Sequence, residues 1–181
     1  MRCVGKTVAM RQFAKYYAEK KGYGILDYDF DGNAGLTMRN PYDLRDDILK
    51  KCDGNGHTII LLHEFQKIQR WDTILEELIP VNAGEFFLTA SDDSVRELGK
   101  SKILSKSFVE IRMYPMTLHE FMEFNGIQSS RAALEEYIRI GGLPVVKASL
   151  PPETAKIVLD GVFSTALLKD VLPYGRSIAS S

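Results

Sequence analysis

Four short stretches of the chain carry the hydrophobic pattern of β-strands. Residues 24–31 alternate apolar with acidic side chains, which is typical of a strand with one face covered, and they end in a turn. Residues 58–62 form a continuous apolar run, as in a strand that is buried on both faces of a parallel sheet. Two shorter apolar stretches, 86–89 and 108–113, complete a set of four predicted strands.

Apolar residues also recur at helical spacing between and after these strands. The first helix is expected to follow Gly5-Lys6-Thr7 and to stop at Gly22. Asn40-Pro41 predicts a capped helix start, and Thr117 with Glu120 predicts a capping box. Further helices are predicted at 71–79, around 134–138 and from about 152 to 172, with a break at 141–144. A short helix is also predicted after Ser91 or Asp92, and Val95 and Leu98 would form its apolar side.

Strands that alternate with helices predict parallel βαβ units with right-handed crossovers. The chain is therefore expected to have an α/β fold, in which helices flank a parallel sheet, followed by a helical appendage. Its 181 residues suffice for one compact domain with a sizeable core.

The amino-acid composition indicates an ordinary globular protein and does not indicate any particular ligand. Hydrophobic residues make up 45% and charged residues 26% of the chain, as in ordinary globular proteins. The 23 basic and 24 acidic side chains nearly cancel, so the net charge does not indicate a nucleic acid or an anionic membrane as a partner. Cys3 and Cys52 form no metal-like pair, and no apolar run approaches the roughly 20 residues that cross a bilayer. With no secretory signal visible, we expect a cytoplasmic protein with reduced thiols.

The first candidate site is Val4-Gly5-Lys6-Thr7, at the start of a predicted helix. A phosphate-binding loop needs glycine where backbone N–H groups approach phosphate oxygens, lysine to neutralise the β- and γ-phosphates, and serine or threonine to hold Mg²⁺. The full pattern has another glycine five residues before Gly5, a position that falls before Met1. Taken alone, the motif fits equally well a surface Gly-Lys-Thr at a helix start.

The second candidate site is His63-Glu64, which ends the apolar strand at 58–62. Glu64 occupies the position of a carboxylate that polarises an attacking water. The preceding position would hold an aspartate that orients Mg²⁺, and His63 stands there instead. Because Mg²⁺ prefers oxygen ligands, a neutral imidazole is a poor substitute. The alternative interpretation is an incidental His-Glu pair at a strand end.

The third candidate is the segment 88–91, a strand that ends in small polar residues. Ser91 can sense a γ-phosphate, or it can cap the following helix. No nucleophile–base pattern links His57 or His119 to a serine or cysteine, and both are interpreted as surface or packing residues. Trp71 has the spacing of a core residue.

Taken in order, these segments resemble the AAA-type prokaryotic ATP-binding proteins, which carry an N-terminal P-loop domain and a C-terminal nuclease-like domain. Val4-Gly5-Lys6-Thr7 is similar to the end of their Walker A loop. Residues 61–67 with Trp71 are similar to their Walker B block, usually Asp-Glu-Ile-Gln followed by a tryptophan. Further matching segments are the sensor strand at 88–91, residues 114–121, the Gly-Gly-x-Pro turn within 137–144, and residues 167–170.

The resemblance implies an ATP-binding AAA-type ATPase domain with ATP and Mg²⁺ as cofactors. Residues 1–115 would form the P-loop core and residues 116–181 a helical lid-like region, each truncated relative to the family.

Each site residue is carried over by its motif. Val4, Gly5, Lys6 and Thr7 would bind the nucleotide, and Thr7 would also ligate Mg²⁺. The catalytic residue that polarises water would be Glu64. Ser91 would contact the γ-phosphate and belongs to the nucleotide-binding set.

Three departures from the family change what is expected of the site. The strand before the loop and its first glycine are absent, His63 replaces the Walker B aspartate, and Lys106-Ser107 replace a usual Gly-Arg pair. An arginine that stabilises the transferring phosphoryl group can contribute strongly to turnover, so these changes predict binding rather than efficient hydrolysis. Because a missing buried strand forfeits about 1.5–3 kcal/mol for each apolar side chain, we also expect poor stability, self-association or a protein partner.

Two functions stay open at this point. One is an ATP-binding domain with little turnover, and the other is a non-enzymatic interaction or scaffold protein on a decayed P-loop fold. Retained Gly5, Lys6, Thr7 and Glu64 favour the first. A small-molecule kinase is disfavoured because the chain has no recognisable acceptor site.

Overall fold

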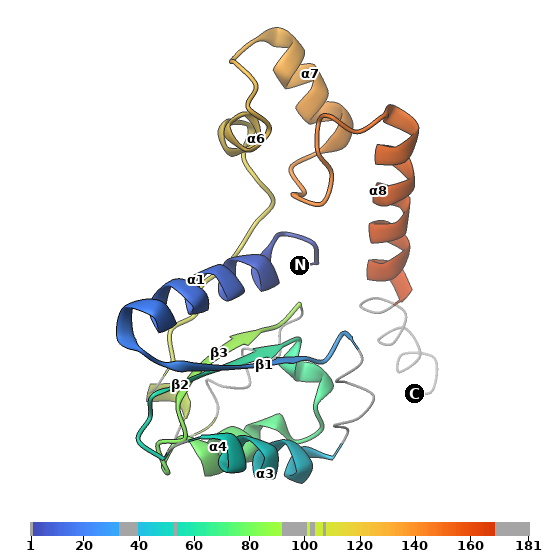
Figure 1. The fold of residues 1–181 in the computed structure, drawn as a ribbon. Helices are drawn as coiled ribbons and strands as arrows, with labels where there is room; N and C mark the ends of the chain where they lie inside the picture. The colour runs from blue at the N-terminus through green and yellow to red at the C-terminus, as the bar shows by residue number, and fades with distance from the viewer. Residues whose placement is uncertain are drawn as a thin grey trace, which may run out of the picture. The chain divides into compact units, whose positions relative to one another are not determined.

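The computed structural model describes residues 2–32, 40–52, 54–91, 101, 104–106 and 108–168, and the chain divides into two compact units. Among the described residues, the sheet unit runs from Lys6 to Ile111, and the helical unit comprises residues 2–5 and 112–168. Figure 1 shows a parallel sheet between helices in the first and three helices in the second.

A parallel sheet forms the centre of the sheet unit. Strand β2 (Thr58–His63) lies between β1 (Gly24–Asp29) and β3 (Glu85–Thr89). The register places Asp29 beside His63 and His63 beside Thr89, so the carboxyl ends of all three strands meet at one end of the sheet. In parallel α/β sheets this is the end at which ligands bind.

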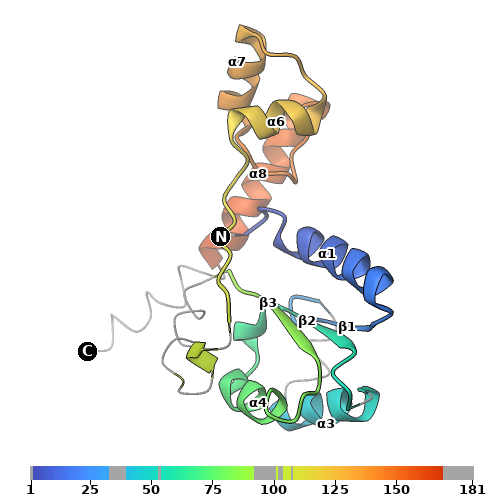
Figure 2. The ribbon, with the colours of Figure 1, turned by 90° about the vertical axis from the view of Figure 1, so that its left-hand side faces the viewer.

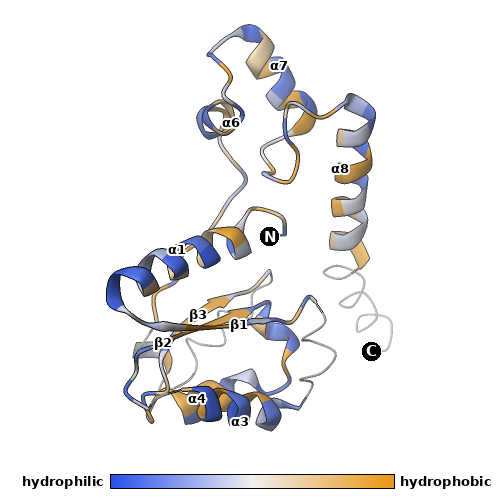
Figure 3. Cartoon of the chain, viewed as in Figure 1, coloured by the Kyte–Doolittle hydropathy of each residue, from blue (hydrophilic) through white to orange (hydrophobic). Residues whose placement is uncertain are grey.

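Helix α1 (Lys6–Lys21) covers one face of the sheet. Ala14 and Ala18 of this helix pack against Ile59 and Leu61 of β2. Figure 3 shows α1 mostly in hydrophilic colours, because only a narrow strip of this helix is buried. The small alanine side chains let the helix lie close to the strand that ends in His63.

The opposite face of the sheet carries α3 (Pro41–Lys51) and α4 (Trp71–Leu78), as Figure 2 shows. Ile60 and Leu62 of β2 point into this side, so the side chains of β2 alternate between two cores. The larger core also holds Leu44, Ile48, Ile74, Leu75 and Leu78. Every residue of β2 is buried, which confirms the interpretation of its continuous apolar run.

The helical unit contains α6 (Leu118–Asn125), α7 (Arg131–Ile140) and α8 (Pro152–Ala166). Phe121 and Ile140, with Val146 and Ala155, form its buried core. None of the helices in the described ranges is both long and apolar enough to cross a bilayer.

The predicted helix starts are confirmed at two positions. The Asn40 side chain accepts a hydrogen bond from the backbone N–H of Tyr42, with Pro41 as the first helical residue. Thr117 and Glu120 form the reciprocal capping box at the start of α6. Both motifs satisfy backbone donors that no helical carbonyl can reach.

The fourth predicted strand is wrong. Residues 108–113 have no regular secondary structure, and Val109 and Ile111 are 88% and 83% exposed. A strand is stabilised by pairing with a neighbour, and no strand in the described part of the chain pairs with this segment. Its apolar pattern was therefore not sufficient to make it a strand.

Two other predicted helices extend beyond what the structure describes. The helix expected after Ser91 or Asp92, with Val95 and Leu98, falls in residues 92–100, which lie outside the described ranges. The last helix was expected to reach about residue 172, and residues 169–172 lie outside them as well. Within them, α8 is formed as expected.

A close approach between neighbouring strands makes the position of Gly84 a sensitive test of this sheet. A Cβ atom at Gly84 would lie 2.3 Å from the carbonyl oxygen of Thr58, so Gly84→Ala must push β3 away from β2. We expect a loss of about 1–3 kcal/mol in unfolding free energy, measured by urea denaturation. The control is Gly24→Ala in β1, where a Cβ would meet nothing within 4 Å. Equal effects of the two substitutions would contradict the packing of β3 described above.

Candidate functional site

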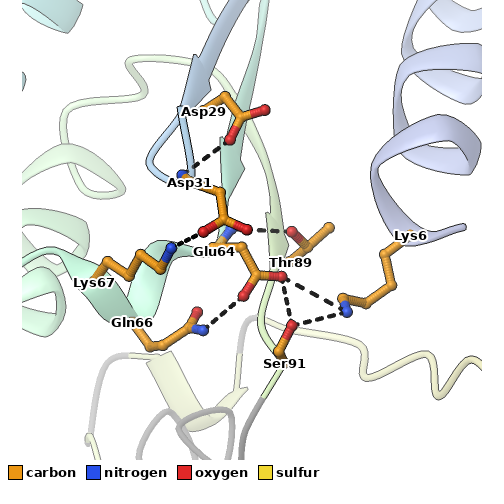
Figure 4. A network of polar contacts seen from close by, with 8 residues as sticks. All are labelled: Lys6, Asp29, Asp31, Glu64, Gln66, Lys67, Thr89 and Ser91. Atoms are coloured by element: carbon orange, nitrogen blue, oxygen red, sulfur yellow. Dashed lines mark hydrogen bonds and ion pairs between the residues drawn. The ribbon is translucent and has the colours of Figure 1, made fainter. Parts of the chain in front are cut away.

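Lys6, the first residue of α1, points toward the carboxyl end of the sheet. Its Nζ donates a hydrogen bond to Ser91 Oγ at 3.1 Å and lies 3.7 Å from Glu64 Oε1. Ser91 follows β3 and Glu64 follows β2, so three separate elements bring these groups together, as Figure 4 shows. These are the lysine, the acid and the polar residue that the sequence predicted for three different motifs.

Glu64 is fixed at several points around this cluster. Ser91 Oγ donates to Glu64 Oε1 at 2.7 Å, and Gln66 Nε2 donates to Oε2 at 2.9 Å. The backbone N–H of Glu64 donates to Thr89 Oγ1 at 3.1 Å, which ties the end of β2 to the end of β3. Both oxygens of this carboxylate therefore have donors, and its position depends on neighbours from two strands.

The backbone at Glu64 is left-handed, with φ 55° and ψ 46°. Residues other than glycine rarely adopt this conformation, which costs of order 1–3 kcal/mol and persists only where the surroundings enforce it. At Glu64 it turns the chain from β2 into the short helix η1 (Phe65–Lys67). The turn is also held by an ion pair between Lys67 and Asp31, shown in Figure 4. The strain therefore aims Glu64 away from the strand and toward Lys6.

The Lys6–Ser91–Glu64 cluster is largely withdrawn from water. The side chains of Lys6 and Glu64 are 17% and 9% exposed. A cation and an acid in such surroundings stabilise each other, and removal of one leaves the other desolvated without a counter-charge. The ammonium group and the carboxylate therefore depend on each other for their charge balance.

The other residues of the predicted loop differ in what the structure says of them. Gly5 has φ 93°, a value that favours glycine, and Val4 is buried. Both belong to the helical unit, whereas Thr7 lies in the first turn of α1 and is half-buried. The backbone at Gly5 thus adopts a conformation that a residue with a Cβ atom would rarely adopt.

His63 lies on the α1 side of the sheet and its side chain is fully buried. Its Nε2 is 3.1 Å from Asp27 Oδ1, but neither ring nitrogen makes a hydrogen bond of ordinary geometry with any described residue. Arg11 of α1 binds Asp27 with two contacts, at 2.6 and 3.2 Å, and its Nη2 lies 3.5 Å from Asp29 Oδ2. His63 therefore faces an arginine–carboxylate cluster that already balances much of its own charge.

Burial and neighbouring charges shift the titration of this cluster. Burial lowers the pKa of His63 and outweighs the opposing pull of Asp27, so the imidazole is neutral at neutral pH. Burial alone would raise the pKa of Asp27, but hydrogen bonds from Arg11 and nearby positive charge bring it below its usual value. Asp27 is thus ionised and committed to Arg11.

These residues fit a triphosphate better than they fit a hard cation. Lys6, Ser91 and Glu64 bring a cation, a hydroxyl and a carboxylate to one point. A cation and a hydroxyl suit a phosphate, and a carboxylate suits a water molecule as its hydrogen-bond acceptor. At His63, where the Mg²⁺-orienting carboxylate is expected, the structure has a buried neutral imidazole. Among the described residues no group of three His, Cys, Asp or Glu side chains could hold a metal ion.

Four residues near the site were missed as participants by sequence reasoning. Gln66 and Thr89 lie within motifs that were recognised, and only the fold shows that they hold Glu64. Arg11 and Asp27 carried a weaker signal, because a strand with alternating acids reads as a solvent-facing strand. Only the fold shows that Arg11 of α1, the helix before this strand, lies opposite its acidic residues Asp27 and Asp29.

Comparison with known proteins agrees with the α/β fold. Residues 1–122 match the model of the AAA domain family. A protein of Haemophilus influenzae, described only as uncharacterized, is 25% identical over 175 residues, which cover 92% of this chain and 43% of that protein. The chain thus spans less than half the length of this relative. No solved structure matches the chain. With the family model covering most of its length, the chain belongs to the AAA domain family of P-loop nucleoside triphosphatases.

Proposed function

We propose that this chain binds ATP at the carboxyl end of its sheet. The observation that carries the proposal is the convergence of Lys6, Ser91 and Glu64 within 2.7–3.7 Å of one another from three separate elements. Nucleotide binding is the property that AAA domain membership supports. We assign the P-loop core to residues 1–115 and a helical lid-like region to residues 116–181.

The four residues of the loop would hold the phosphates. Lys6 would exchange Glu64 for the β- and γ-phosphates, and backbone N–H groups around Val4 and Gly5 would cradle phosphate oxygens. When bound, ATP would supply the phosphoryl group that water attacks, and Mg²⁺ would supply charge neutralisation. Thr7 is the residue we assign to that ion.

Glu64 and Ser91 would act at the γ-phosphate. Once Lys6 turns to the phosphates, the Glu64 carboxylate would be available to accept a hydrogen bond from the attacking water. Ser91 contacts both Lys6 and Glu64, so its hydrogen bonds would change when Lys6 turns from Glu64 to the γ-phosphate.

We expect binding to exceed turnover. His63 cannot supply the anionic oxygen that a Mg²⁺-bound water prefers, and the nearest carboxylate, Asp27, is committed to Arg11.

A non-enzymatic interaction or scaffold role is the second candidate, and the burial of His63 favours it. A fully buried imidazole without an aligned hydrogen bond is a cost of about 1–3 kcal/mol. A hydrolytic site under selection would be expected to place that polar group against a metal or substrate.

The lysine distinguishes the two candidates. Lys6→Ala should weaken Mg-ATP binding by about 10- to 100-fold, because it removes a charge-assisted contact of about 1.5–3 kcal/mol. Calorimetric titration measures the affinity, and the shift of melting temperature with ATP checks it. Lys15→Ala is the matched control, since Lys15 is an exposed lysine of the same helix. Equal affinities of the wild type and both variants would leave only the scaffold role.

The site of His63 supplies a test of turnover that must include Asp27. His63→Asp alone would bring a second carboxylate close to Asp27 Oδ1, so we expect it to destabilise the chain by like-charge repulsion. Asp27→Asn should relieve that repulsion, and the double variant should hydrolyse ATP at least about tenfold faster than the wild type. Urea denaturation and phosphate release measure the two effects.

The turnover and the stability of these variants test two different statements about His63. A double variant that folds and binds ATP without faster turnover would show that His63 does not limit hydrolysis. Additive effects of the two substitutions on stability would contradict the coupling between residues 63 and 27.

A further inference from the structure

One buried acceptor beside Glu64 has no donor in the described part of the chain. Gln66 lies in η1, and its side-chain nitrogen Nε2 donates to Glu64 Oε2 at 2.9 Å. The carbonyl oxygen of the same amide group, Oε1, is buried and has no hydrogen-bond partner among the described residues. Because a buried acceptor without a donor is unfavourable, this oxygen is explained most directly by a ligand that supplies the donor.

The orientation of the Gln66 amide follows from the charge of its neighbour. An ionised carboxylate only accepts hydrogen bonds, so the nitrogen of the amide must face Glu64. Turning the amide over would set Gln66 Oε1 against Glu64 Oε2, an acceptor against an acceptor. Figure 4 shows the nitrogen of Gln66 directed at Glu64. Oε1 is therefore held by the same contact that leaves it without a donor.

The other polar side chains around Glu64 already have partners. Ser91 Oγ donates to Glu64 Oε1 and accepts from Lys6 Nζ, and Thr89 Oγ1 accepts from the backbone N–H of Glu64. Gln66 differs from these residues, because one end of its amide is bound to Glu64 and the other end can still accept. A hydrogen-bond donor that reaches Glu64 thus meets a second acceptor in Gln66.

A water molecule provides two hydrogens for two such acceptors. When both of its O–H groups are bound, a lone pair of its oxygen is left to face an electrophile. Phosphoryl-transfer enzymes use carboxylates as the acceptor of the proton of the nucleophile, and they use glutamine amides to orient an attacking water. Glu64 and Gln66 bring one acceptor of each kind to the turn that follows β2.

We propose that Gln66 Oε1 accepts a hydrogen bond from the water molecule that attacks the γ-phosphate, while Glu64 accepts the other hydrogen. This role rests on the proposed binding of ATP at the carboxyl end of the sheet. The water oxygen forms a bond to the γ-phosphorus, and the bond from that phosphorus to the bridging oxygen of ADP breaks. One proton of the water passes to Glu64, and the other stays on the oxygen and leaves with inorganic phosphate. Gln66 gains no proton and serves only to orient the water.

The proposed contact separates turnover from binding. The attacking water belongs to the transition state, so loss of its acceptor lowers the rate and leaves the affinity for ATP nearly unchanged. The low turnover expected of this chain follows from His63 and concerns the metal ion, whereas Gln66 acts on the water. The two effects can therefore be measured independently.

Gln66→Leu removes the amide and keeps a side chain of similar size. ADP with aluminium fluoride and Mg²⁺ imitates the γ-phosphate under attack by water, and its binding can be measured however slow turnover is. We expect Gln66→Leu to weaken binding of this analogue, and to slow single-turnover phosphate release, by at least about tenfold. The affinity for ATP, measured by calorimetry, should stay within about threefold of the wild type. Gln69→Leu is the matched control, since Gln69 is an exposed glutamine three residues further along.

Gln66→Glu provides a second test if Gln66→Leu does not fold. It replaces the donor to Glu64 Oε2 by an oxygen, and two adjacent carboxyl groups share a proton as the pH falls. A shared proton restores the donor and leaves a carbonyl acceptor for water. The affinity of this variant for the analogue, relative to the wild type at the same pH, should therefore rise at acid pH. Gln69→Glu should show no such change.

The outcomes separate this role from the proposed function. A wild type that binds no ATP would overturn both. A wild type that binds ATP, together with a Gln66→Leu variant that keeps its affinity for the analogue, would overturn the role of Gln66 alone. Equal losses of affinity for ATP and for the analogue would also overturn it, because they would show that Gln66 acts on the bound nucleotide and not on the water.

Discussion

The candidate site depends on one carboxylate that is held in place from several directions. Glu64 leaves a fully buried strand through a left-handed turn, and this conformation is enforced by the hydrogen bond between its backbone N–H and Thr89. Its side chain is then shared between Ser91 and Gln66, beside the ammonium group of Lys6. Removal of either Lys6 or Glu64 would leave the other charge desolvated without a counter-charge, so the two depend on each other.

The sheet makes this arrangement possible because β2 is buried on both faces. Alternate residues of β2 belong to different cores, one under α1 and one above α3 and α4. The same alternation sends His63 under α1 and the next residue, Glu64, out of the sheet. One residue is thereby enclosed with Asp27 and Arg11, while its neighbour meets Lys6. Two adjacent motif positions consequently have opposite environments: the His63 side chain is fully buried under α1, and the Glu64 carboxylate lies beside Lys6.

Sequence reasoning predicted the parts of the fold whose cause is local. The continuous apolar run of β2, the Asn40 cap and the capping box at Thr117 each contain their own physical reason, and all three are present. The segment at 108–113 failed because a strand depends on a partner elsewhere in the sheet. The pattern of that segment alone carries no information about whether such a partner exists.

The candidate site shows the same division. Lys6, Glu64 and Ser91 were identified separately from motifs, and the parallel register then brings them together. The pairing of His63 with Asp27 could not be predicted, because it joins two strands through a contact that depends on burial under α1. His63, which departs from the Walker B motif, thus contacts Asp27 of the neighbouring strand β1. Asp27 lies two residues before Asp29, the residue paired with His63 in the sheet, so only the fold reveals the contact.

The central claim is that the ammonium group of Lys6 is the phosphate contact of this protein. An ATP analogue with a reactive acyl-phosphate group labels lysines that lie beside bound phosphates, and mass spectrometry locates the labelled residue. We expect Lys6 to be labelled ahead of the other lysines and to be protected by unmodified ATP. Labelling spread over exposed lysines, with no protection of Lys6 by ATP, would contradict it.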